Sequence, residues 1–220
     1  MLVSREKLAS MIDHTLLQPA ADRAAVRKLC SEARANSFGH VCVNPHYVAE
    51  VRELIRGSGV GICSVVGFPF GASLPDVKAF EARRAVELGA DEVDMVLDLA
   101  SLKNGEDFAV REDIAGVVKA SGVTTKVILE TGHLGEDEIR KACAIAMDAG
   151  AHFVKTSTGF GPGGATVAHV RLMKSVVHDK LGIKASGGIR SYDAARSMIE
   201  AGATRIGTCS GPAIVDGWRH

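Results

Sequence analysis

Short apolar runs alternate along this chain with longer segments in which apolar residues recur every three or four positions. The short runs are typical of buried strands, and the longer segments have the period of amphipathic helices. The pattern predicts eight strands, at residues 11–14, 40–44, 61–67, 92–97, 125–130, 152–156, 183–186 and 204–207. Strands that alternate with helices indicate a parallel sheet, because parallel neighbours need crossover connections.

A local repeat strengthens this prediction. Residues 88–94 (LGADEVD), 149–155 (AGAHFVK) and 201–207 (AGATRIG) share one pattern, a helix stopped by glycine and then a short strand. Pro75 and Ser191 are typical of helix starts. We therefore expect a single (β/α)8 TIM barrel formed by one domain of residues 1–220, with an open doubly wound sheet as the alternative. In a barrel, catalytic groups collect at the carboxyl ends of the strands.

Composition narrows the classes of partner. Lys plus Arg and Asp plus Glu number 26 each, and the sequence pI is about 7.1. This balance gives no electrostatic argument for binding nucleic acid or an anionic membrane. The five cysteines are scattered without a C-x-x-C pair, and no signal-peptide pattern or membrane-length apolar run is present. We expect a cytoplasmic protein.

Two lysines near predicted strand ends suggest chemistry. Lys155 follows Phe153 and Val154, and Lys184 lies on the next strand along the chain. Two ammonium groups about 4 Å apart repel by about 4 kcal/mol at an effective dielectric constant of 20, enough to lower the pKa of one by roughly three units. A neutral amine can form a Schiff base with a carbonyl compound. The alternative is that each lysine reaches solvent from a strand end.

Carboxylates on other strands could move protons for such an amine. Asp94 ends the fourth strand, and Asp13 lies near the end of the first. Glu92, Lys126 and Glu130 have the period-2 spacing to face the interior as well. Alternatively, these charges form an ion-pair network that only organises the barrel.

Glycine-rich segments after the seventh and eighth strands favour phosphate binding. Gly187 and Gly188 follow the seventh strand, while Gly207 and Ser210 lie at and after the end of the eighth. Barrels often bind phosphate there through backbone N–H groups. Cys42 could line the same cavity or simply fill the core. The histidines show no metal-binding spacing, so we expect neither a metal nor another cofactor.

Several segments together resemble the deoxyribose-phosphate aldolase family over nearly the whole chain. They are IDHTLL at 12–17, VCVNP at 41–45, VVGFP at 65–69, ADEVD at 90–94, KVILET at 126–131, FVKTSTGFG at 153–161, KASGGIR at 184–190 and IGT at 206–208. The resemblance implies a metal-free barrel enzyme that reversibly cleaves 2-deoxy-D-ribose 5-phosphate to D-glyceraldehyde 3-phosphate and acetaldehyde. Its partners would be a small phosphorylated sugar and a short aldehyde, and a homo-oligomer, dimer or tetramer, is expected.

The resemblance also implies roles for individual residues. Lys155 corresponds to the Schiff-base lysine, Lys184 to its pKa-lowering neighbour and Asp94 to the proton-relay carboxylate. The matching substrate ligands are Asp13, Thr15, Cys42 and Thr158, and the matching phosphate ligands are Gly159, Gly187, Gly188, Gly207 and Ser210.

This chain departs from common family patterns at three places. Cys209 stands where relatives have the first of two serines, Phe160 where some have lysine, and the chain lacks a terminal tyrosine. Two other functions stay open. One is a transaldolase-like Schiff-base enzyme acting on another sugar phosphate, and the other is a phosphosugar-binding barrel without turnover.

Overall fold

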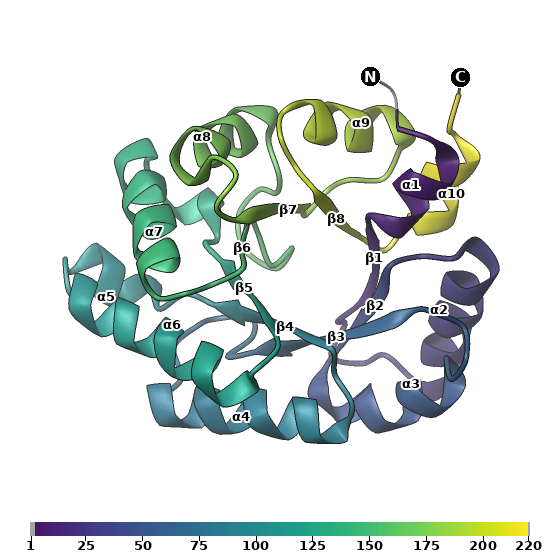
Figure 1. The fold of residues 1–220 in the computed structure, drawn as a ribbon, viewed down its shortest axis with the longest axis horizontal. Helices are drawn as coiled ribbons and strands as arrows, with labels where there is room; N and C mark the ends of the chain where they lie inside the picture. The colour runs from purple at the N-terminus through teal and green to yellow at the C-terminus, as the bar shows by residue number, and fades with distance from the viewer. Residues whose placement is uncertain (1–2, 220) are drawn as a thin grey trace.

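Eight parallel strands alternate with helices in the computed structural model, which describes residues 3–219 (Figure 1). In chain order the elements are α1 (Arg5–Ser10), β1 (Ile12–Leu16), α2 (Arg23–Asn36), β2 (His40–Val43), η1 (Pro45–Tyr47), α3 (Val48–Leu54), β3 (Gly61–Val66), α4 (Pro75–Leu88), β4 (Glu92–Val96), α5 (Leu99–Lys103), α6 (Asp107–Ser121), β5 (Thr124–Ile128), η2 (Thr131–His133), α7 (Glu136–Asp148), β6 (Phe153–Lys155), α8 (Val167–Val177), β7 (Gly182–Ser186), α9 (Tyr192–Glu200), β8 (Arg205–Thr208) and α10 (Gly211–Asp216).

The strands close into a barrel in sequence order. Each strand pairs in parallel with the next, and β1 pairs with β8 to complete the ring. The predicted (β/α)8 TIM barrel is therefore confirmed, and the open doubly wound alternative is wrong. Each predicted strand overlaps an observed one. The expected domain of 1–220 includes residues 1, 2 and 220, which lie outside the described part of the chain.

Helix boundaries follow the local signals in the sequence. Pro75 occupies the first turn of α4, where its missing N–H costs nothing, and Gly89 ends that helix in a left-handed conformation with φ of 116°. Ser191 caps α9 by accepting a hydrogen bond from the N–H of Ala194. Helices that start and stop at these points return the chain to the amino-terminal end of the next strand.

Side chains from alternate strands fill the barrel interior in layers. The register and the period of two define four layers. The layer at the amino-terminal end contains His40, Glu92, Phe153 and Arg205, and the second contains Asp13, Cys63, Lys126 and Lys184. The third contains Cys42, Asp94, Lys155 and Gly207, and the layer at the mouth contains Thr15, Val65, Ile128 and Ser186. Such layers are usually dominated by bulky branched residues. Here most of the interior is polar or charged.

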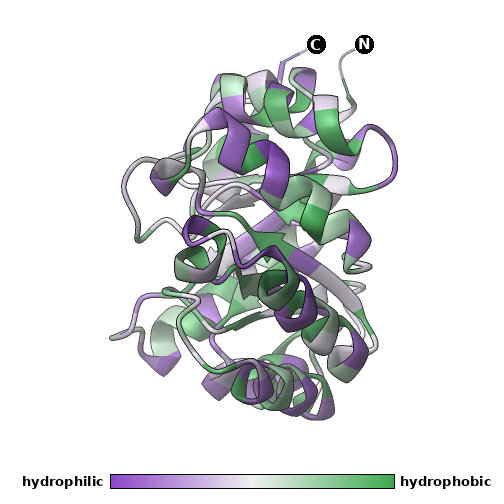
Figure 2. Cartoon of the chain, turned by 90° about the vertical axis from the view of Figure 1, so that its left-hand side faces the viewer, coloured by the Kyte–Doolittle hydropathy of each residue, from purple (hydrophilic) through white to green (hydrophobic). Residues whose placement is uncertain are grey.

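The main apolar core lies outside the barrel wall, between strands and helices. Outward-facing residues such as Val43, Val66 and Met95 belong to one large buried cluster with helix residues such as Leu29 and Ala85. Figure 2 shows the corresponding mixture of hydrophobic and hydrophilic residues along the outer helices. This core stabilises the fold, which leaves the interior free for polar groups. Among residues 3–219, no helix is both long and apolar enough to cross a membrane.

One predicted interior residue lies elsewhere. The expected fifth strand continued to Glu130, but β5 ends at Ile128. Glu130 has a left-handed backbone conformation with φ of 53°, which is uncommon for a residue other than glycine. The alternation of side chains stops where the strand ends, so Glu130 leaves the interior and contacts the loop that follows β6.

Candidate active site

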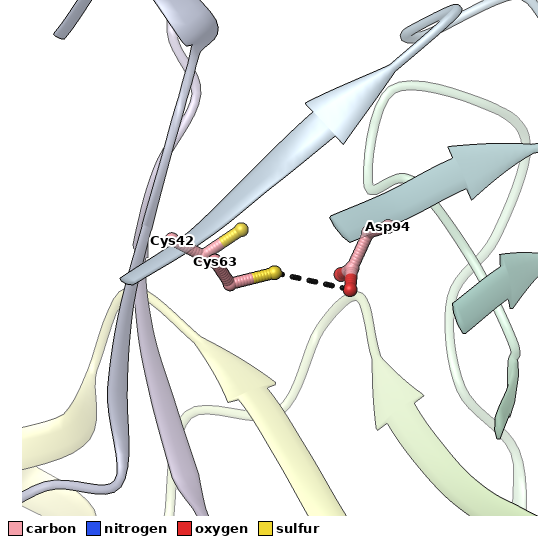
Figure 3. Close-up of side chains that lie close together, drawn as sticks. All are labelled: Cys42, Cys63 and Asp94. Carbon is pink, nitrogen blue, oxygen red and sulfur yellow. Dashed lines mark hydrogen bonds between the residues drawn. The ribbon is translucent and has the colours of Figure 1, made fainter. Parts of the chain in front are cut away.

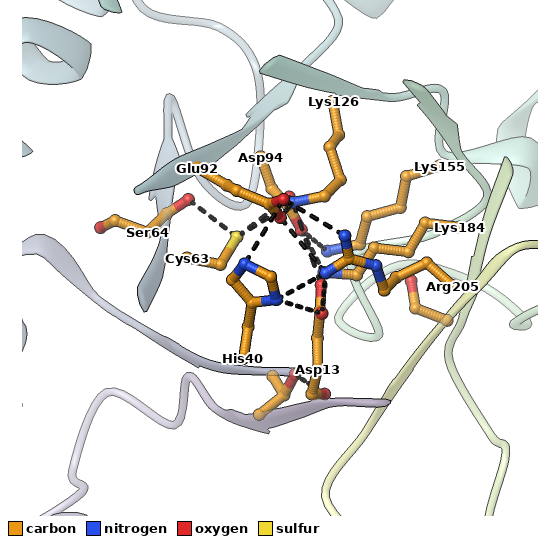
Figure 4. A network of polar contacts seen from close by, with 12 residues as sticks. Asp13, His40, Cys63, Ser64, Glu92, Asp94, Lys126, Lys155, Lys184 and Arg205 are labelled. Carbon is orange, nitrogen blue, oxygen red and sulfur yellow. Dashed lines mark hydrogen bonds and ion pairs between the residues drawn. The ribbon is translucent and has the colours of Figure 1, made fainter. Parts of the chain in front are cut away.

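Asp94 is the centre of a buried network of ion pairs inside the barrel (Figure 4). Its Oδ1 accepts a hydrogen bond from Nζ of Lys126 at 2.8 Å. Its Oδ2 accepts from Nζ of Lys155 at 2.8 Å and from Nζ of Lys184 at 2.7 Å. The register of β6 and β7 pairs Lys155 with Lys184. The two predicted lysines therefore leave neighbouring strands side by side and reach one carboxylate oxygen.

A second carboxylate, Asp13, extends the network toward the amino-terminal end of the barrel. One oxygen of Asp13 accepts a hydrogen bond from Lys184, and the other accepts from Nη1 of Arg205 at 2.8 Å. Arg205 also donates to Glu92, with Nη2 and Oε1 3.2 Å apart, and Oε2 of Glu92 lies 2.7 Å from Nζ of Lys126. Ion pairs therefore connect Arg205 with Lys155 without a break.

The charges in this network hold one another in place. Burial alone favours neutral carboxyl groups, but the surrounding cations lower the pKa of Asp13 and hold the pKa of Asp94 well below its usual range. Burial also opposes the charged form of Lys184, yet Asp13 and Asp94 raise its pKa well above the ordinary lysine value. The pKa of Lys126 is likewise raised, chiefly by Asp94, against the effect of burial. Both carboxylates and both of these lysines are charged at neutral pH.

This arrangement changes the electrostatic argument drawn from the sequence. That argument considered only repulsion between two ammonium groups. In the structure, Asp94 bonds to both lysines and Asp13 binds Lys184 as well. Attraction to two carboxylates outweighs repulsion at Lys184, so its pKa rises. Among the described residues, Lys155 forms an ion pair with Asp94 alone.

A cavity of about 230 Å³ opens beside Lys155 at the carboxyl ends of the strands. The predicted site residues in its wall are Thr15, Lys155, Thr158, Gly159, Gly187, Gly188 and Gly207. Gly187 and Gly188 have φ of 94° and 80°, values that side-chain-bearing residues rarely adopt. These glycines let the loop after β7 pass close to the cavity without side chains covering its backbone.

A buried carboxylate fixes the conformation of Thr158. The hydroxyl of Thr158 donates to Glu130, and its backbone N–H also donates to Oε2 of Glu130 at 3.2 Å. The hydroxyl oxygen in turn accepts from the N–H of Phe160 at 3.0 Å. The hydroxyl proton is therefore already engaged. Thr158 can accept a hydrogen bond from a ligand with its remaining lone pair but has no proton to donate.

Five predicted site residues do not line this cavity. Asp94 and Lys184 are fully buried beneath it, and Asp94 links Lys184 to Lys155 in the cavity wall. The other three are predicted substrate or phosphate ligands. Asp13 is fully buried one layer below it, and Cys42 is fully buried in the layer of Lys155. Ser210 is half-buried immediately before α10, where its N–H donates to Oγ1 of Thr208 at 2.9 Å. Cys209 and Thr208 stand in the cavity wall in place of Ser210.

Gly207 makes room for the lysine beside it. A Cβ atom at this position would lie 3.0 Å from Cε of Lys184 and 2.8 Å from Cβ of Ser186. Contacts this short require a neighbouring atom to move. A side chain here would press on both Ser186 and Lys184, so the lack of a Cβ atom at Gly207 leaves room for Lys184 beside the cavity.

Two cysteines lie close to Asp94 inside the barrel (Figure 3). Cys42 and Cys63 are register partners on β2 and β3. Sγ of Cys63 donates to Oδ1 of Asp94 at 3.1 Å and lies 3.4 Å from Nζ of Lys126. Burial, together with the nearby Asp94, raises the pKa of the Cys63 thiol well above its usual value. The thiol therefore stays protonated and able to donate.

Three further polar residues of this region were not singled out from the sequence. Arg205 stands two positions before Gly207, so the period-2 rule that selected Glu92 also applies to Arg205. His40 begins β2 and lies 2.6 Å from Arg205, measured between Nδ1 and Nη1. Arg190 lines the cavity after the two glycines of the loop following β7. A single arginine in a glycine-rich loop is a weak signal when neighbouring loops are unknown.

Comparison with known proteins agrees with this geometry. The family model described as DeoC/LacD family aldolase matches residues 7–217. The deoxyribose-phosphate aldolase of Caldanaerobacter subterraneus subsp. tengcongensis is 52% identical over 216 residues, covering 96% of this chain and 94% of the relative. That of Carboxydothermus hydrogenoformans is 53% identical over 221 residues, covering 98% and 97%.

Solved structures give the same result. A structure described as a unique tetrameric deoxyribose phosphate aldolase from Aeropyrum pernix has a TM-score of 0.90 and 37% identity, covering 97% of this chain and 91% of that one. The structure described as QR15, an aldolase, has a TM-score of 0.91 and 40% identity, with coverage of 95% and 94%. The resemblance inferred from the sequence motifs is therefore confirmed.

Proposed function

This chain belongs to the DeoC/LacD family of aldolases, and from that membership we propose that it reversibly cleaves 2-deoxy-D-ribose 5-phosphate through a Schiff base on Lys155. The products would be D-glyceraldehyde 3-phosphate and acetaldehyde. The names of relatives about half identical in sequence support this substrate. The observation that carries the mechanism is that Lys155 and Lys184 bind one oxygen of Asp94 beside the cavity.

Charge balance supports Lys155 as the nucleophile. The interior network joins four basic side chains to three carboxylates, namely Lys126, Lys155, Lys184 and Arg205 with Asp13, Glu92 and Asp94. A buried charge without a partner is costly. Lys184 and Arg205 each bind two carboxylates, whereas Lys155 binds one. Among the described residues of this network, Lys155 therefore has the fewest carboxylate partners, and it is the lysine that lines the cavity.

The reaction begins when the neutral amine of Lys155 adds to the C1 aldehyde of the open-chain sugar. Loss of water gives an iminium ion. The C3 hydroxyl then loses its proton as the C2–C3 bond breaks, and the electron pair of that bond forms the enamine of acetaldehyde. Glyceraldehyde 3-phosphate leaves. Protonation of the enamine carbon and addition of water release acetaldehyde and restore the amine.

Asp94 and Lys184 have different roles in these steps. Asp94 bonds to both lysines, so it can relay protons to and from the reacting atoms through water. Lys184 remains a cation and opposes a second positive charge on Lys155. Asp13 is a positioning residue in this scheme, because it binds Lys184 and lies below the cavity.

The remaining cavity residues fit the ends of the substrate. Thr15 and Thr158 are proposed ligands of sugar hydroxyls, with Thr158 accepting a hydrogen bond. The phosphate would lie against the backbone of Gly159, Gly187 and Gly188, which line the cavity without side chains, and backbone N–H groups can donate hydrogen bonds to an anion. Arg190, also in the cavity wall, would add positive charge to a site in which Cys209 is a weak donor.

Reductive trapping tests the Schiff base. Acetaldehyde and borohydride should leave an ethyl group on Lys155, identified by peptide mass spectrometry, and inactivate the enzyme. Lys155→Met should lose both the adduct and acetaldehyde release. Lys119→Met, at an exposed position on α6, is the control and should keep both. A folded and active wild-type protein without an adduct on Lys155 would refute the mechanism.

Substrate specificity needs a separate measurement. Acetaldehyde release from 2-deoxyribose 5-phosphate, assayed with EDTA present, tests the proposed reaction directly. Pyruvate and dihydroxyacetone, offered as donors in place of acetaldehyde, test the transaldolase-like alternative. Turnover with either donor but not with acetaldehyde would assign another substrate to the same lysine.

A homo-oligomer is also proposed. Val77 and Phe80 on α4 and Phe108 on α6 are exposed, and α4 packs against α6. Exposed apolar side chains grouped on adjacent helices favour burial in an interface. The tetrameric relative from Aeropyrum pernix agrees with assembly. Light scattering should give the mass of a dimer or tetramer. The cytoplasmic location expected from the free cysteines stays a prediction.

A further inference from the structure

Cys42, Cys63 and Asp94 bring two sulfur atoms and one carboxylate oxygen together inside the barrel. These three potential ligand atoms all lie within 4.8 Å of one another, and all three residues are fully buried. Tetrahedral zinc bound by sulfur at about 2.3 Å and oxygen at about 2.1 Å separates its ligand atoms by roughly 3.5–3.8 Å. The observed 3.1 Å between Cys63 Sγ and Asp94 Oδ1 requires a small widening. We propose that these residues form an inhibitory site for a thiophilic divalent cation such as Zn²⁺.

The lysines around Asp94 at first argue against a cation, but the proton balance removes this objection. A bound metal ion deprotonates its thiol ligands. One divalent cation enters while two thiol protons, from Cys42 and Cys63, leave to solvent. The net charge beside Lys126, Lys155 and Lys184 is therefore unchanged. Two thiolates also match the preference of zinc for sulfur over oxygen-only sites.

The neighbouring cluster of Asp13, Cys63 and Glu92 is a poorer site. Its ligand atoms are equally close, but only one thiol proton can leave. Local positive charge would then increase beside Arg205, which binds both carboxylates and cannot lose its proton. The pair of cysteines therefore distinguishes the site at Cys42, Cys63 and Asp94.

The site adjoins the cavity, from which an ion would enter. Cys42 is the register partner of Thr15, and Thr15 lines the cavity. Lys155, in the same interior layer as Cys42 and Asp94, also lines it. The ligands therefore lie immediately beneath the cavity. Three protein ligands leave a fourth position for water, as in open zinc sites.

Binding of the ion would stop the reaction proposed above by occupying Asp94. The ion competes with Lys126 for Oδ1 and draws the carboxylate away from its contacts with Lys155 and Lys184. Inhibition rests on the proposed aldolase mechanism, whereas binding of the ion does not. Binding and inhibition therefore need separate measurements.

Cadmium tests binding independently of activity, because cadmium thiolates absorb in the ultraviolet. Titration of the reduced full-length protein with CdCl2 should produce this absorption and saturate at one ion per chain. Cys63→Ser and Cys42→Ser should each weaken it. Cys209→Ser, which removes the exposed thiol of the cavity wall, and Cys143→Ala, which alters a buried position on α7, should leave it intact. Circular dichroism checks that each variant is folded.

Zinc tests inhibition. ZnCl2 should inhibit acetaldehyde release, and EDTA should restore it. Inhibition of each variant is expressed relative to its own zinc-free rate. Cys63→Ser should raise the zinc concentration for half inhibition by at least about 10-fold, because loss of an outer partner of a metal ligand already weakens binding by about 10- to 100-fold. Cys209→Ser should not shift it.

Three results would overturn the proposal. Cadmium absorption that survives in both folded Cys42→Ser and Cys63→Ser, or disappears in Cys209→Ser, rejects the site. Binding without zinc inhibition of an active enzyme rejects its inhibitory role. A protein that binds cadmium at these cysteines yet never releases acetaldehyde would instead contradict the proposed function and leave the site supported.

Discussion

At the scale of single residues, the chemistry of the interior depends on one carboxylate that contacts three lysines. The lysines differ in how many carboxylates compensate their positive charge. Lys184 is bound by two carboxylates and remains a cation, whereas Lys155 shares Asp94 with its neighbours. Small changes at this point therefore alter both the protonation of the network and its geometry.

Replacing Lys184 tests its electrostatic role. Lys184→Leu should lose most activity near neutral pH and regain part of it at alkaline pH. Without this cation, Asp94 is held by Lys126 and Lys155 alone, and the positive charge beside the amine of Lys155 is lost. A profile of kcat/KM against pH measures the displacement.

Lys184→Arg is the matched variant, because it keeps the positive charge. The acid limb of its kcat/KM profile should lie at nearly the same pH as that of the wild type, even if kcat falls. Loss of one partner from a buried ion pair costs about 3–5 kcal/mol, so the fold of Lys184→Leu must be verified first. A folded Lys184→Leu enzyme with an unshifted pH profile would contradict the electrostatic role.

Gly207 gives a second prediction at this scale. Gly207→Ala should lower activity and destabilise the protein by about 1–3 kcal/mol, the usual cost of overpacking, because the new methyl group presses on Lys184 and Ser186. Urea unfolding and kcat measure the two effects. Gly116→Ala on α6, where an added Cβ meets no atom within 4 Å, is the control and should not reduce stability. Equal effects at both positions would exclude the steric explanation.

At the scale of elements, a buried ion pair fixes two outer helices to a strand of the site. Nζ of Lys78 on α4 donates to Oδ2 of Asp113 on α6 at 2.6 Å, and to the carbonyl oxygen of Val96 at 3.2 Å. Val96 is the last residue of β4, two residues after Asp94. Lys78 therefore holds the strand that carries the central carboxylate.

Removing Lys78 should be far more damaging than removing both partners. Lys78→Met leaves a buried, uncompensated Asp113 and should lower the free energy of unfolding by about 3–5 kcal/mol. The double variant Lys78→Met, Asp113→Leu should recover most of this loss. Urea unfolding of both single variants and the double variant completes the cycle. Additive losses would contradict a direct interaction between the two side chains.

At the scale of the whole molecule, closure of the barrel makes stability depend on charges that are distant in sequence. Asp13 and Arg205 are 192 positions apart, yet their side chains bond across the seam where β1 meets β8. This ion pair and its neighbours exist only in the folded chain. Their loss on unfolding links stability to pH.

Stability should be greatest between about pH 4 and pH 10 and fall on both sides. The lowered pKa values of Asp13 and Asp94 give stability that is present above the unfolded value, about 3.9, and lost as pH falls through the folded value. The raised pKa values of Lys126 and Lys184 give stability that is present below about 10.4 and lost as pH rises through their folded values.

Urea midpoints measured across this range test the linkage. Asp13→Asn removes one of the acids with a lowered pKa, so its stability should depend less steeply on pH below about 4 than that of the wild type. A wild-type midpoint that stays constant from pH 5 to pH 2 would show that these carboxylates do not stabilise the fold.

The sequence alone determined the order of elements and several inward positions. Strand and helix periods arise from which face of each element is buried, and glycine stops are local, so the alternation and the repeat ending at Asp94, Lys155 and Gly207 were visible in the chain. The predicted position of Glu130 inside the barrel was wrong, because the residue at which a strand ends depends on pairing with neighbouring strands.

Only the tertiary structure decided how the inward residues act on one another. The raised pKa of Lys184 depends on Asp13, which approaches it when β1 closes against β8. The set of Cys42, Cys63 and Asp94 likewise comes from three strands and has no linear spacing. Electrostatic and coordination effects depend on distances between side chains, and those distances are fixed by the barrel rather than by neighbours in the sequence.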